Sequence, residues 1–246
     1  MLNMASIHPN DDMFIGDLHH YERVGREFCE FVREAQTLAE SASPKILELP
    51  CGYGRCTRHL AEAFDRSAIT VADVLPGAVD FCKQTFGVTG VAVCDPINEF
   101  SNINDEYFDI AAMGSLITHM SERNAGIILK NYMKKLRTNG VAVITTTGQK
   151  AFDLLRARVW FDDQLADEDK IRLEEAYQAG SYGFINYLPG HSFEKKTVDY
   201  IGDSYGMSMI PHQWMVKTVD SLGGKIQKCV VGGWDNHQDV YYISKT

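Results

Sequence analysis

Residues 45–54 constrain the fold of this chain more than any other segment. They read Lys-Ile-Leu-Glu-Leu-Pro-Cys-Gly-Tyr-Gly, a short apolar strand that ends in an acid and is followed by a loop with two glycines. Gly52 and Gly54 permit positive φ angles and remove the Cβ atoms that would hold a ligand away from the main chain. Open α/β sheets bind ligands at the carboxyl ends of their strands, where Glu48 is expected to lie. The segment therefore predicts a loop that binds a nucleoside cofactor.

Length and composition indicate one globular α/β domain. The chain has 246 residues, 45% of them hydrophobic, which is enough to bury a core. A formal net charge of −9 argues against electrostatic capture of nucleic acid. Six cysteines lack C-x-x-C or zinc-ligand spacing and are expected to be reduced. Because neither a signal sequence nor a membrane-length apolar run is found, we expect a cytoplasmic protein with no membrane partner.

The apolar pattern then alternates between strand and helix along the first part of the chain. Residues 17–40 have the stripe of an amphipathic leader helix. Strands are expected at about 45–49, 68–72, 90–94, 108–113 and 141–146, and helices at about 55–65, 76–86 and 121–137. Asn139-Gly140 is expected to end the last of these helices. Strands that alternate with helices imply crossover connections and a parallel sheet.

The second part of the chain predicts a cap and a terminal hairpin. Residues 148–208 lose the alternation and are rich in charged and aromatic side chains, which suggests an inserted, partly helical cap. A helix at 211–222 and strands at 225–231 and 239–244 follow, and their hairpin implies a mixed sheet. The expected division is a leader at 1–44, a core at 45–147 and 209–246, and a cap or substrate subdomain at 148–208.

Acids at successive strand ends distinguish two cofactor classes. Asp73 ends the second strand, where an acid can accept hydrogen bonds from both ribose hydroxyls of an adenosine, and Asp95 ends the third. Thr57 stands where a dinucleotide fingerprint has its third glycine, which disfavours NAD. Carboxylates suit a ligand with an ammonium and a sulfonium, and would repel a pyrophosphate. S-adenosylmethionine (SAM) is therefore favoured, although each acid alone could equally be a solvated loop residue or a helix N-cap.

Together these residues resemble the class I SAM-dependent methyltransferases, over about residues 45–147 and 210–246. The resemblance implies a Rossmann-like sheet of order 3-2-1-4-5-7-6, with the last strand antiparallel and helices on both faces. It implies that the loop from Glu48 through Leu49, Pro50, Cys51 and Gly52 to Gly54 wraps the methionine part of SAM, that Asp73 holds the ribose and that Asp95 contacts the adenine. The end of the fourth strand, Met113, Gly114 and Ser115, is expected to line the methyl-transfer pocket, and Val74 and Pro96 are further expected cofactor contacts.

Two details refine this resemblance. Pro50 departs from the family pattern acid-x-Gly-x-Gly-x-Gly and makes the turn stiffer. The segments Leu-Pro-Cys-Gly-Tyr-Gly-Arg, Gly-Ser-Leu-Ile-Thr-His and Trp-Asp-Asn-His-Gln-Asp-Val-Tyr are similar to a bacterial subgroup whose members stand alone or beside sugar transferases.

Methylation of oxygen calls for a general base, and two histidines are candidates. His119 follows the fourth strand, close to the expected methyl group; the alternative is a helix-capping or packed histidine. His237 lies two positions before Asp239, so that strand alternation would place both on one face, where the carboxylate could fix the imidazole tautomer. The alternative for this pair is a turn stabilised by Asn236 and His237.

Tyr187 and His191 of the cap and Tyr21 of the leader helix are candidates for substrate contact, with packing or solvent exposure as the alternative. No metal site is predicted. The expected function is SAM-dependent methyl transfer to a small molecule, at a hydroxyl and with sugars or glycoconjugates as the first guess. The alternatives are an NAD-dependent oxidoreductase and a non-catalytic SAM-binding regulator or partner subunit.

Overall fold

A seven-stranded mixed sheet organises the chain, and the computed structural model describes residues 7–93, 100–159, 165–187 and 205–246. The strands of this sheet are β1 (Ile46–Glu48), β2 (Ile69–Asp73), β3 (Thr89–Ala92), β4 (Phe108–Met113), β5 (Leu136–Thr146), β8 (Gly224–Trp234) and β9 (Gln238–Lys245). Their order is β3-β2-β1-β4-β5-β9-β8. Numbered within this sheet alone, that is the predicted order 3-2-1-4-5-7-6, so the predicted topology is confirmed.

Strand direction brings the carboxyl ends of five strands to one edge of the sheet. The pairs β2–β3, β1–β2, β1–β4 and β4–β5 are parallel, so Glu48, Asp73 and Met113 end their strands on the same side. The last strand, β9, runs antiparallel to both β5 and β8. Because of this reversal, the beginning of β9, Gln238, lies at the edge where the parallel strands end.

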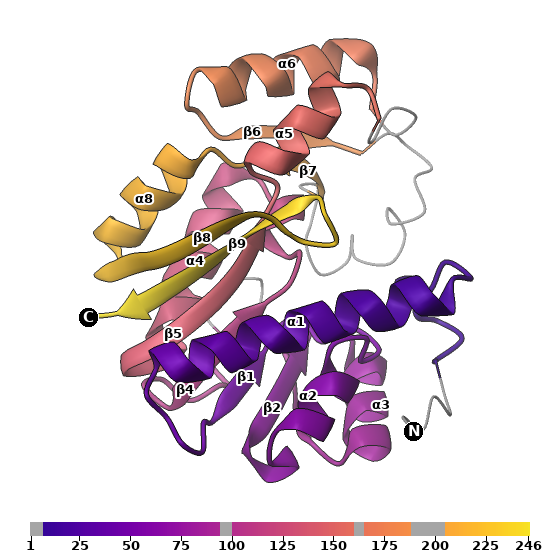
Figure 1. Cartoon of the computed structure of the whole chain (residues 1–246), viewed down its shortest axis with the longest axis vertical. Helices are drawn as coiled ribbons and strands as arrows, with labels where there is room; N and C mark the ends of the chain where they lie inside the picture. Colours follow the sequence, from indigo (N-terminus) through magenta and orange to yellow (C-terminus); the bar gives the residue numbers. More distant parts are fainter. Residues whose placement is uncertain (1–6, 94–99, 160–164, 188–204) are drawn as a thin grey trace.

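Helices cover both faces of the sheet, as predicted (Figure 1). The helices are α1 (Leu18–Leu38), α2 (Thr57–Ala63) and α3 (Pro76–Phe86) on one face, and α4 (Glu122–Lys135) and α8 (His212–Ser221) on the other. Successive strand residues alternate between the two cores: Ile46 packs under α1 and α2, whereas Leu47 packs under α4. The apolar strand sequences are thus explained by burial on both sides.

The predicted leader helix, α1, is part of the cover of the sheet. Asp17 caps it by accepting a hydrogen bond from the backbone N–H of His20, and its buried stripe includes Val24, Phe28 and Val32. Gly25 lies where α1 crosses the glycine loop, and a Cβ there would overlap the carbonyl oxygen of Arg55 and the ring of His59. The helix and the loop therefore pack backbone against backbone.

A third apolar cluster, defined by Ala151, Phe152, Leu155, Leu165, Leu173, Tyr187, Met207 and Met209, lies in the predicted cap. It is formed by α5 (Gln149–Arg156), α6 (Asp167–Gln178) and the antiparallel pair β6 (Gly183–Asn186) and β7 (Gly206–Met209). Figure 1 shows these elements together at one end of the molecule. The cap contains an antiparallel strand pair that the sequence pattern did not indicate, and the predicted domain division stays a prediction.

Two predicted boundaries are wrong. Helix α4 ends at Lys135 and β5 begins at Leu136, so Asn139-Gly140 lies within a strand and does not end the helix. Asn139 has a φ of 63°, and a Cβ on Gly140 would lie 2.9 Å from the Arg137 carbonyl oxygen. The Asn-Gly signal marks a left-handed residue, which helix ends and irregular strands share. Similarly, β8 continues past residue 231 to Trp234.

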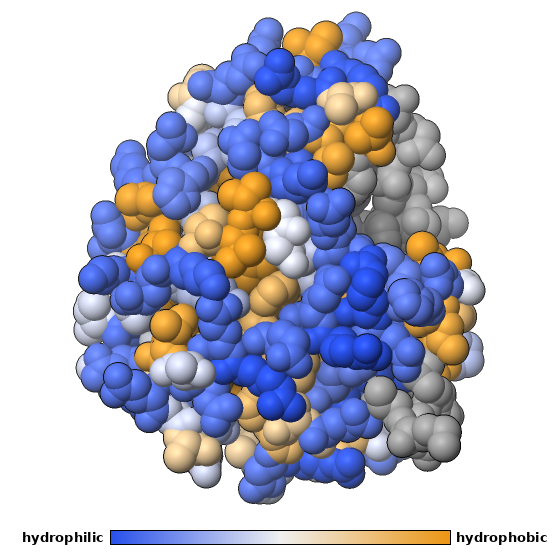
Figure 2. Space-filling model, viewed as in Figure 1, coloured by the Kyte–Doolittle hydropathy of each residue, from blue (hydrophilic) through white to orange (hydrophobic). Residues whose placement is uncertain are grey.

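The surface of the molecule is mostly polar on the face that Figure 2 shows, where apolar residues form small separate groups. Among the helices that the structure describes, none combines the length and the apolar character needed to cross a membrane.

Candidate active site

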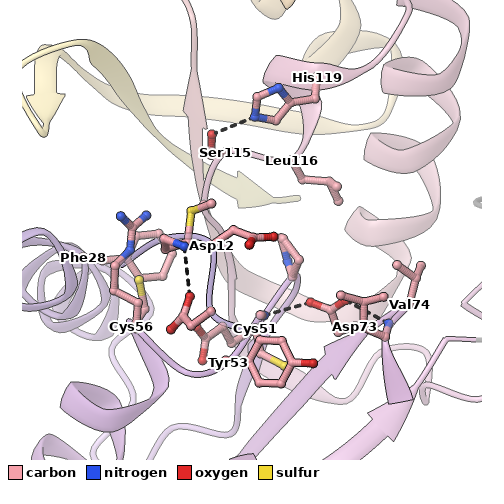
Figure 3. A pocket seen from close by; sticks show the side chains of 18 of the residues that line it. Asp12, Phe28, Cys51, Tyr53, Cys56, Asp73, Val74, Ser115, Leu116 and His119 are labelled. Atoms are coloured by element: carbon pink, nitrogen blue, oxygen red, sulfur yellow. Dashed lines mark hydrogen bonds between the residues drawn. The ribbon is translucent and has the colours of Figure 1, made fainter. Parts of the chain in front are cut away.

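A pocket of about 530 Å³ opens at the carboxyl ends of β1, β2 and β4 (Figure 3). Of the predicted site residues, it is lined by Glu48, Pro50, Cys51, Gly52, Asp73, Val74, Gly114, Ser115 and His119. Leu49 and Gly54 do not line it: Leu49 packs in the core, and Gly54 lies against Phe86. Asp95, Pro96 and His191 lie outside the described residues.

Glu48 is a buried carboxyl group at the base of the pocket. It is 2% exposed, and the hydroxyl of Thr57 donates a hydrogen bond to its Oε2 at 2.7 Å. Burial raises the pKa of Glu48 to about 8; the Thr57 bond opposes the rise and the charge of Asp73 adds to it. The carboxyl group is therefore largely protonated at neutral pH in the ligand-free protein.

Asp73 shapes the glycine loop. One of its carboxylate oxygens accepts a hydrogen bond from the backbone N–H of Gly52 at 2.8 Å, and the other accepts one from Leu75 at 3.0 Å (Figure 3). Burial raises its pKa, while these backbone N–H groups oppose the rise. A carboxylate has about four lone-pair positions, so Asp73 keeps acceptor capacity for hydroxyl groups of a ligand.

A series of side-chain hydrogen bonds that includes Tyr21 holds the glycine loop in place. The Arg58 side chain donates from Nε to the Gly54 carbonyl oxygen at 3.2 Å and from its guanidinium to the Tyr21 hydroxyl at 3.2 Å. Tyr21 in turn donates to Asp11 Oδ2 at 2.5 Å and is 0% exposed. The structure thus does not bring Tyr21 to the pocket as a substrate contact; it links the N-terminal segment to the loop.

His119 and Tyr187, predicted separately as base and substrate residue, lie together. The His119 Nδ1 atom is 2.8 Å from the Tyr187 hydroxyl and 3.1 Å from the carbonyl oxygen of Gly206 in β7. Its Nε2 atom is 3.5 Å from Ser115 Oγ (Figure 3). His119 is therefore positioned by the cap on one side and contacts a pocket residue on the other.

The second predicted pair, His237 with Asp239, is arranged differently from the expectation. Asp239 is 2% exposed, and its carboxylate accepts hydrogen bonds from the backbone N–H groups of Gln149 and Gly232 at 2.7 and 2.9 Å. The acid beside His237 is Asp235, whose Oδ2 lies 3.7 Å from His237 Nδ1. Strand alternation does not relate His237 to Asp239, because β9 begins only at Gln238 and His237 belongs to the turn before it.

Several pocket residues were missed by the sequence argument. Phe28 of α1 and Trp234 of β8 pack with ring centroids 5.3 Å apart, and the Arg55 guanidinium lies over the Trp234 ring at 5.4 Å. A Cβ on Gly114 would lie 3.0 Å from Trp234 and 3.1 Å from Phe28. The glycine after β4 was the available signal, because it indicates a close approach by another group. Phe28 and Trp234, the residues that approach Gly114, lie far from it in the sequence.

The sheet order, with its reversed strand β9, and a pocket lined by a glycine loop and two buried acids define a class of protein. They are the features of a class I SAM-dependent methyltransferase domain, as the sequence resemblance implied. SAM, the cofactor predicted from the sequence, is the one that this class uses.

Comparison with known proteins gives a family match over part of the chain. Residues 46–140 match the family model Methyltransf_25, described as "Methyltransferase domain". A curated relative, a malonyl-[acyl-carrier protein] O-methyltransferase from Bacillus cereus, is 28% identical over 120 residues, which are 48% of this chain and 43% of the relative. The chain thus matches less than half the length of that relative.

Solved structures show the same fold at low sequence identity. The PH0226 protein from Pyrococcus horikoshii has a TM-score of 0.61 at 14% identity and covers 94% of this chain and 93% of its own. The 1,6-didemethyltoxoflavin-N1-methyltransferase from Burkholderia thailandensis, solved with its substrate and S-adenosylhomocysteine (SAH), has a TM-score of 0.58 at 15% identity. It covers 94% of this chain and 81% of its own. At these identities the likeness concerns the fold.

Proposed function

We propose that this chain binds SAM in the pocket and transfers its methyl group to a small-molecule acceptor. The observation that carries the proposal is the pair of buried acids, Glu48 and Asp73, which end neighbouring strands on either side of the glycine loop. Both line a pocket whose other walls include the aromatic rings of Phe28, Tyr53 and Trp234. Buried carboxyl groups favour a positively charged ligand, and aromatic faces attract a sulfonium.

The pocket residues divide into a cofactor side and an acceptor side. Asp73 is assigned to the ribose hydroxyls, and Glu48 with the backbone of Cys51 and Gly52 to the methionine part. The sulfonium carries an activated methyl group, so the protein's tasks are to orient the acceptor and to exclude water. Ser115 and His119 are assigned to the acceptor side, where the cap meets the sheet.

The acceptor atom is proposed to be oxygen. His119 supports this, since a hydroxyl needs a base before it becomes a good nucleophile. The name of the Bacillus cereus relative also describes an O-methyltransferase, whereas the Burkholderia thailandensis structure is of an N-methyltransferase. The sugar or glycoconjugate acceptor expected from the sequence subgroup stays a prediction without further support.

Calorimetric titration with SAM, SAH and NADH tests the cofactor. We expect SAM and SAH to bind, whereas NADH should not, because Thr57 stands where the dinucleotide fingerprint has its third glycine. Tight NADH binding without a response to either adenosyl ligand would reject the proposal. Incubation with SAM and a panel of alcohols, phenols, sugars and amines, read as a methyl mass gain, then tests the acceptor. Binding without turnover over such a panel is what a regulator would show.

Binding of SAM is expected to release a proton from Glu48. The pKa of this group is about 8 in the ligand-free protein, and a cationic ligand favours the ionised form. Affinity should therefore rise as the pH increases towards about 8 and change less above it. Calorimetry at pH 7 in two buffers with different ionisation enthalpies measures the released protons.

The Glu48→Gln variant isolates this effect. It should release fewer protons than the wild type, and taking the difference cancels the titration of the ligand's own amino group. Glu62→Gln, which removes an exposed carboxylate from α2, is the matched control and should behave as the wild type. Equal proton release by the wild type and Glu48→Gln would remove Glu48 from the cofactor site.

A further inference from the structure

Three polar side chains close a hydrogen-bonded ring beside the acceptor side of the pocket. They are Ser115 after β4, Thr145 near the end of β5 and Gln238 at the start of β9. Thr145 and Gln238 are 0% and 5% exposed. Ser115 has a φ of 54°, a conformation that a serine keeps only where its surroundings hold it. The ring supplies such support through both the backbone and the side chain of Ser115.

The hydrogen bonds of the ring run in one direction. The N–H of Ser115 can only donate, and it points to Thr145 Oγ1 at 2.8 Å. The Thr145 hydroxyl donates its own hydrogen to the amide oxygen of Gln238 at 2.6 Å. The other end of the Gln238 amide is consequently the NH₂ group, with two hydrogens to donate.

Both of these hydrogens have acceptors. The side-chain nitrogen of Gln238 donates one hydrogen to Ser115 Oγ at 2.9 Å, and the same nitrogen lies 3.3 Å from Nε2 of His237. Since Ser115 Oγ accepts here, its own hydrogen is directed to another acceptor. Thr118 Oγ1 at 3.1 Å and His119 Nε2 at 3.5 Å are the neighbours in reach.

The far sides of the two histidines agree with this direction independently. His237 Nδ1 lies 3.0 Å from the carbonyl oxygen of Asp235, and His119 Nδ1 lies 3.1 Å from that of Gly206. A carbonyl oxygen only accepts, and the Tyr187 hydroxyl, 2.8 Å from His119 Nδ1, can accept as well, so a hydrogen on Nδ1 of each neutral ring satisfies these contacts. Each Nε2 then has a lone pair, turned towards Gln238 in one case and towards Ser115 in the other.

We propose that Gln238 is a positioning residue for methyl transfer: by donating both amide hydrogens, it orients the Ser115 hydroxyl towards His119 and holds His237 with an unprotonated Nε2. The inference rests on the proposed function for its catalytic meaning. In the transfer, the methyl carbon exchanges its bond to sulfur for a bond to the acceptor oxygen, and sulfur keeps the electron pair. The acceptor's proton passes to Ser115 Oγ as the Ser115 hydrogen passes to Nε2 of His119, while Nδ1–H of His119 continues to donate to the Gly206 carbonyl.

The tautomers of the two histidines provide a test that needs no acceptor. In protein labelled with ¹⁵N-histidine, long-range ¹H–¹⁵N spectra at a pH where the rings are neutral should show both His119 and His237 protonated on Nδ1. His119→Gln and His237→Gln assign the signals by their loss. A wild-type His119 or His237 with its hydrogen on Nε2 would overturn the proposal.

The Gln238→Glu variant tests the role of the amide hydrogens directly. Glutamate has the same shape, but its carboxylate only accepts, so His237 should take a proton on Nε2. Among the described residues, Asp235, Arg55 and His20 also act on His237, and they are unchanged in this variant. The His237 Nε2 signal should therefore move from the unprotonated to the protonated position near neutral pH. An unchanged signal in folded Gln238→Glu protein would contradict the proposal.

Matched measurements separate the ways in which this test can fail. Gln227→Glu adds the same charge at an exposed position of β8 and should leave both tautomers as in the wild type. If Gln238→Glu does not fold, Thr145→Val, which removes the donor to the Gln238 oxygen, should alter the His237 signal; an unchanged signal counts against the ring. SAH calorimetry on the same samples tests cofactor binding. Native tautomers without SAH binding would reject the proposed function alone, whereas SAH binding with the opposite tautomers would reject the ring alone.

Discussion

Replacement of Asp73 by alanine is expected to weaken SAM binding by about 1–3 kcal/mol, a factor of roughly 5 to 150 in Kd. The change removes the acceptor assigned to the ribose hydroxyls, and it also frees the backbone N–H groups of Gly52 and Leu75. The lost acceptor and the freed backbone N–H groups both affect the part of the pocket assigned to the ribose. Calorimetry with SAM and SAH measures the change, and unfolding of the ligand-free variant shows how much of it is loss of structure.

Two further variants make this result specific. Asp73→Asn keeps the shape and one acceptor oxygen, so its loss should be smaller than that of the alanine variant. Asp65→Ala removes an exposed carboxylate that also accepts from a backbone N–H, that of Ser67, away from the pocket. It should bind SAM as the wild type does. An unchanged affinity in Asp73→Ala would remove this residue from the cofactor site.

Replacement of Gly25 by alanine is expected to destabilise the protein by about 1–3 kcal/mol, as overpacking does in a filled core. A glycine-to-alanine change within a helix normally stabilises it by about 0.5–1 kcal/mol. Here the new methyl group overlaps the Arg55 carbonyl oxygen and the His59 ring, so α1 or the glycine loop must move. Because the loop lines the pocket, SAM affinity should fall as well.

The matched control for Gly25 is Gly126 in α4, where a Cβ would meet nothing within 4 Å. Gly126→Ala should therefore stabilise the protein by the usual helical increment. Denaturant unfolding of both variants gives the two free energies, and opposite signs are expected. A Gly25→Ala protein as stable as the wild type would contradict this prediction, because it would show that α1 and the glycine loop can move apart with no loss of unfolding free energy.

The main elements of the fold were predictable because burial acts locally along the chain. Strands buried on both faces appear as short apolar runs, and α1 appears as a stripe, so their positions follow from periodicity. Asn139-Gly140 misled the argument, since a left-handed residue serves a helix end and an irregular strand equally. The antiparallel pair of β6 and β7 was missed because that part of the chain shows no clear alternation.

The cofactor side of the site was more predictable than the acceptor side. Glu48 and Asp73 directly end strands, and in a parallel sheet such positions share one edge. Trp234 and Gln238 reach the same pocket region from the end of the chain, and only the pairing of β5 with β9 brings Gln238 to Thr145 and Ser115. Neighbourhoods of this kind depend on tertiary pairing and leave no local pattern.

The reversed direction of β9 has a consequence for how the two halves of the reaction are encoded. A further parallel strand would begin at the opposite edge, and its first residues would point away from the pocket. Running backwards, β9 places the tight turn at 235–237 beside the reactive centre. Exchange of the last hairpin between homologous genes would therefore alter the handling of the acceptor, while the segments assigned to the nucleoside, which precede β4 in the chain, would be inherited unchanged.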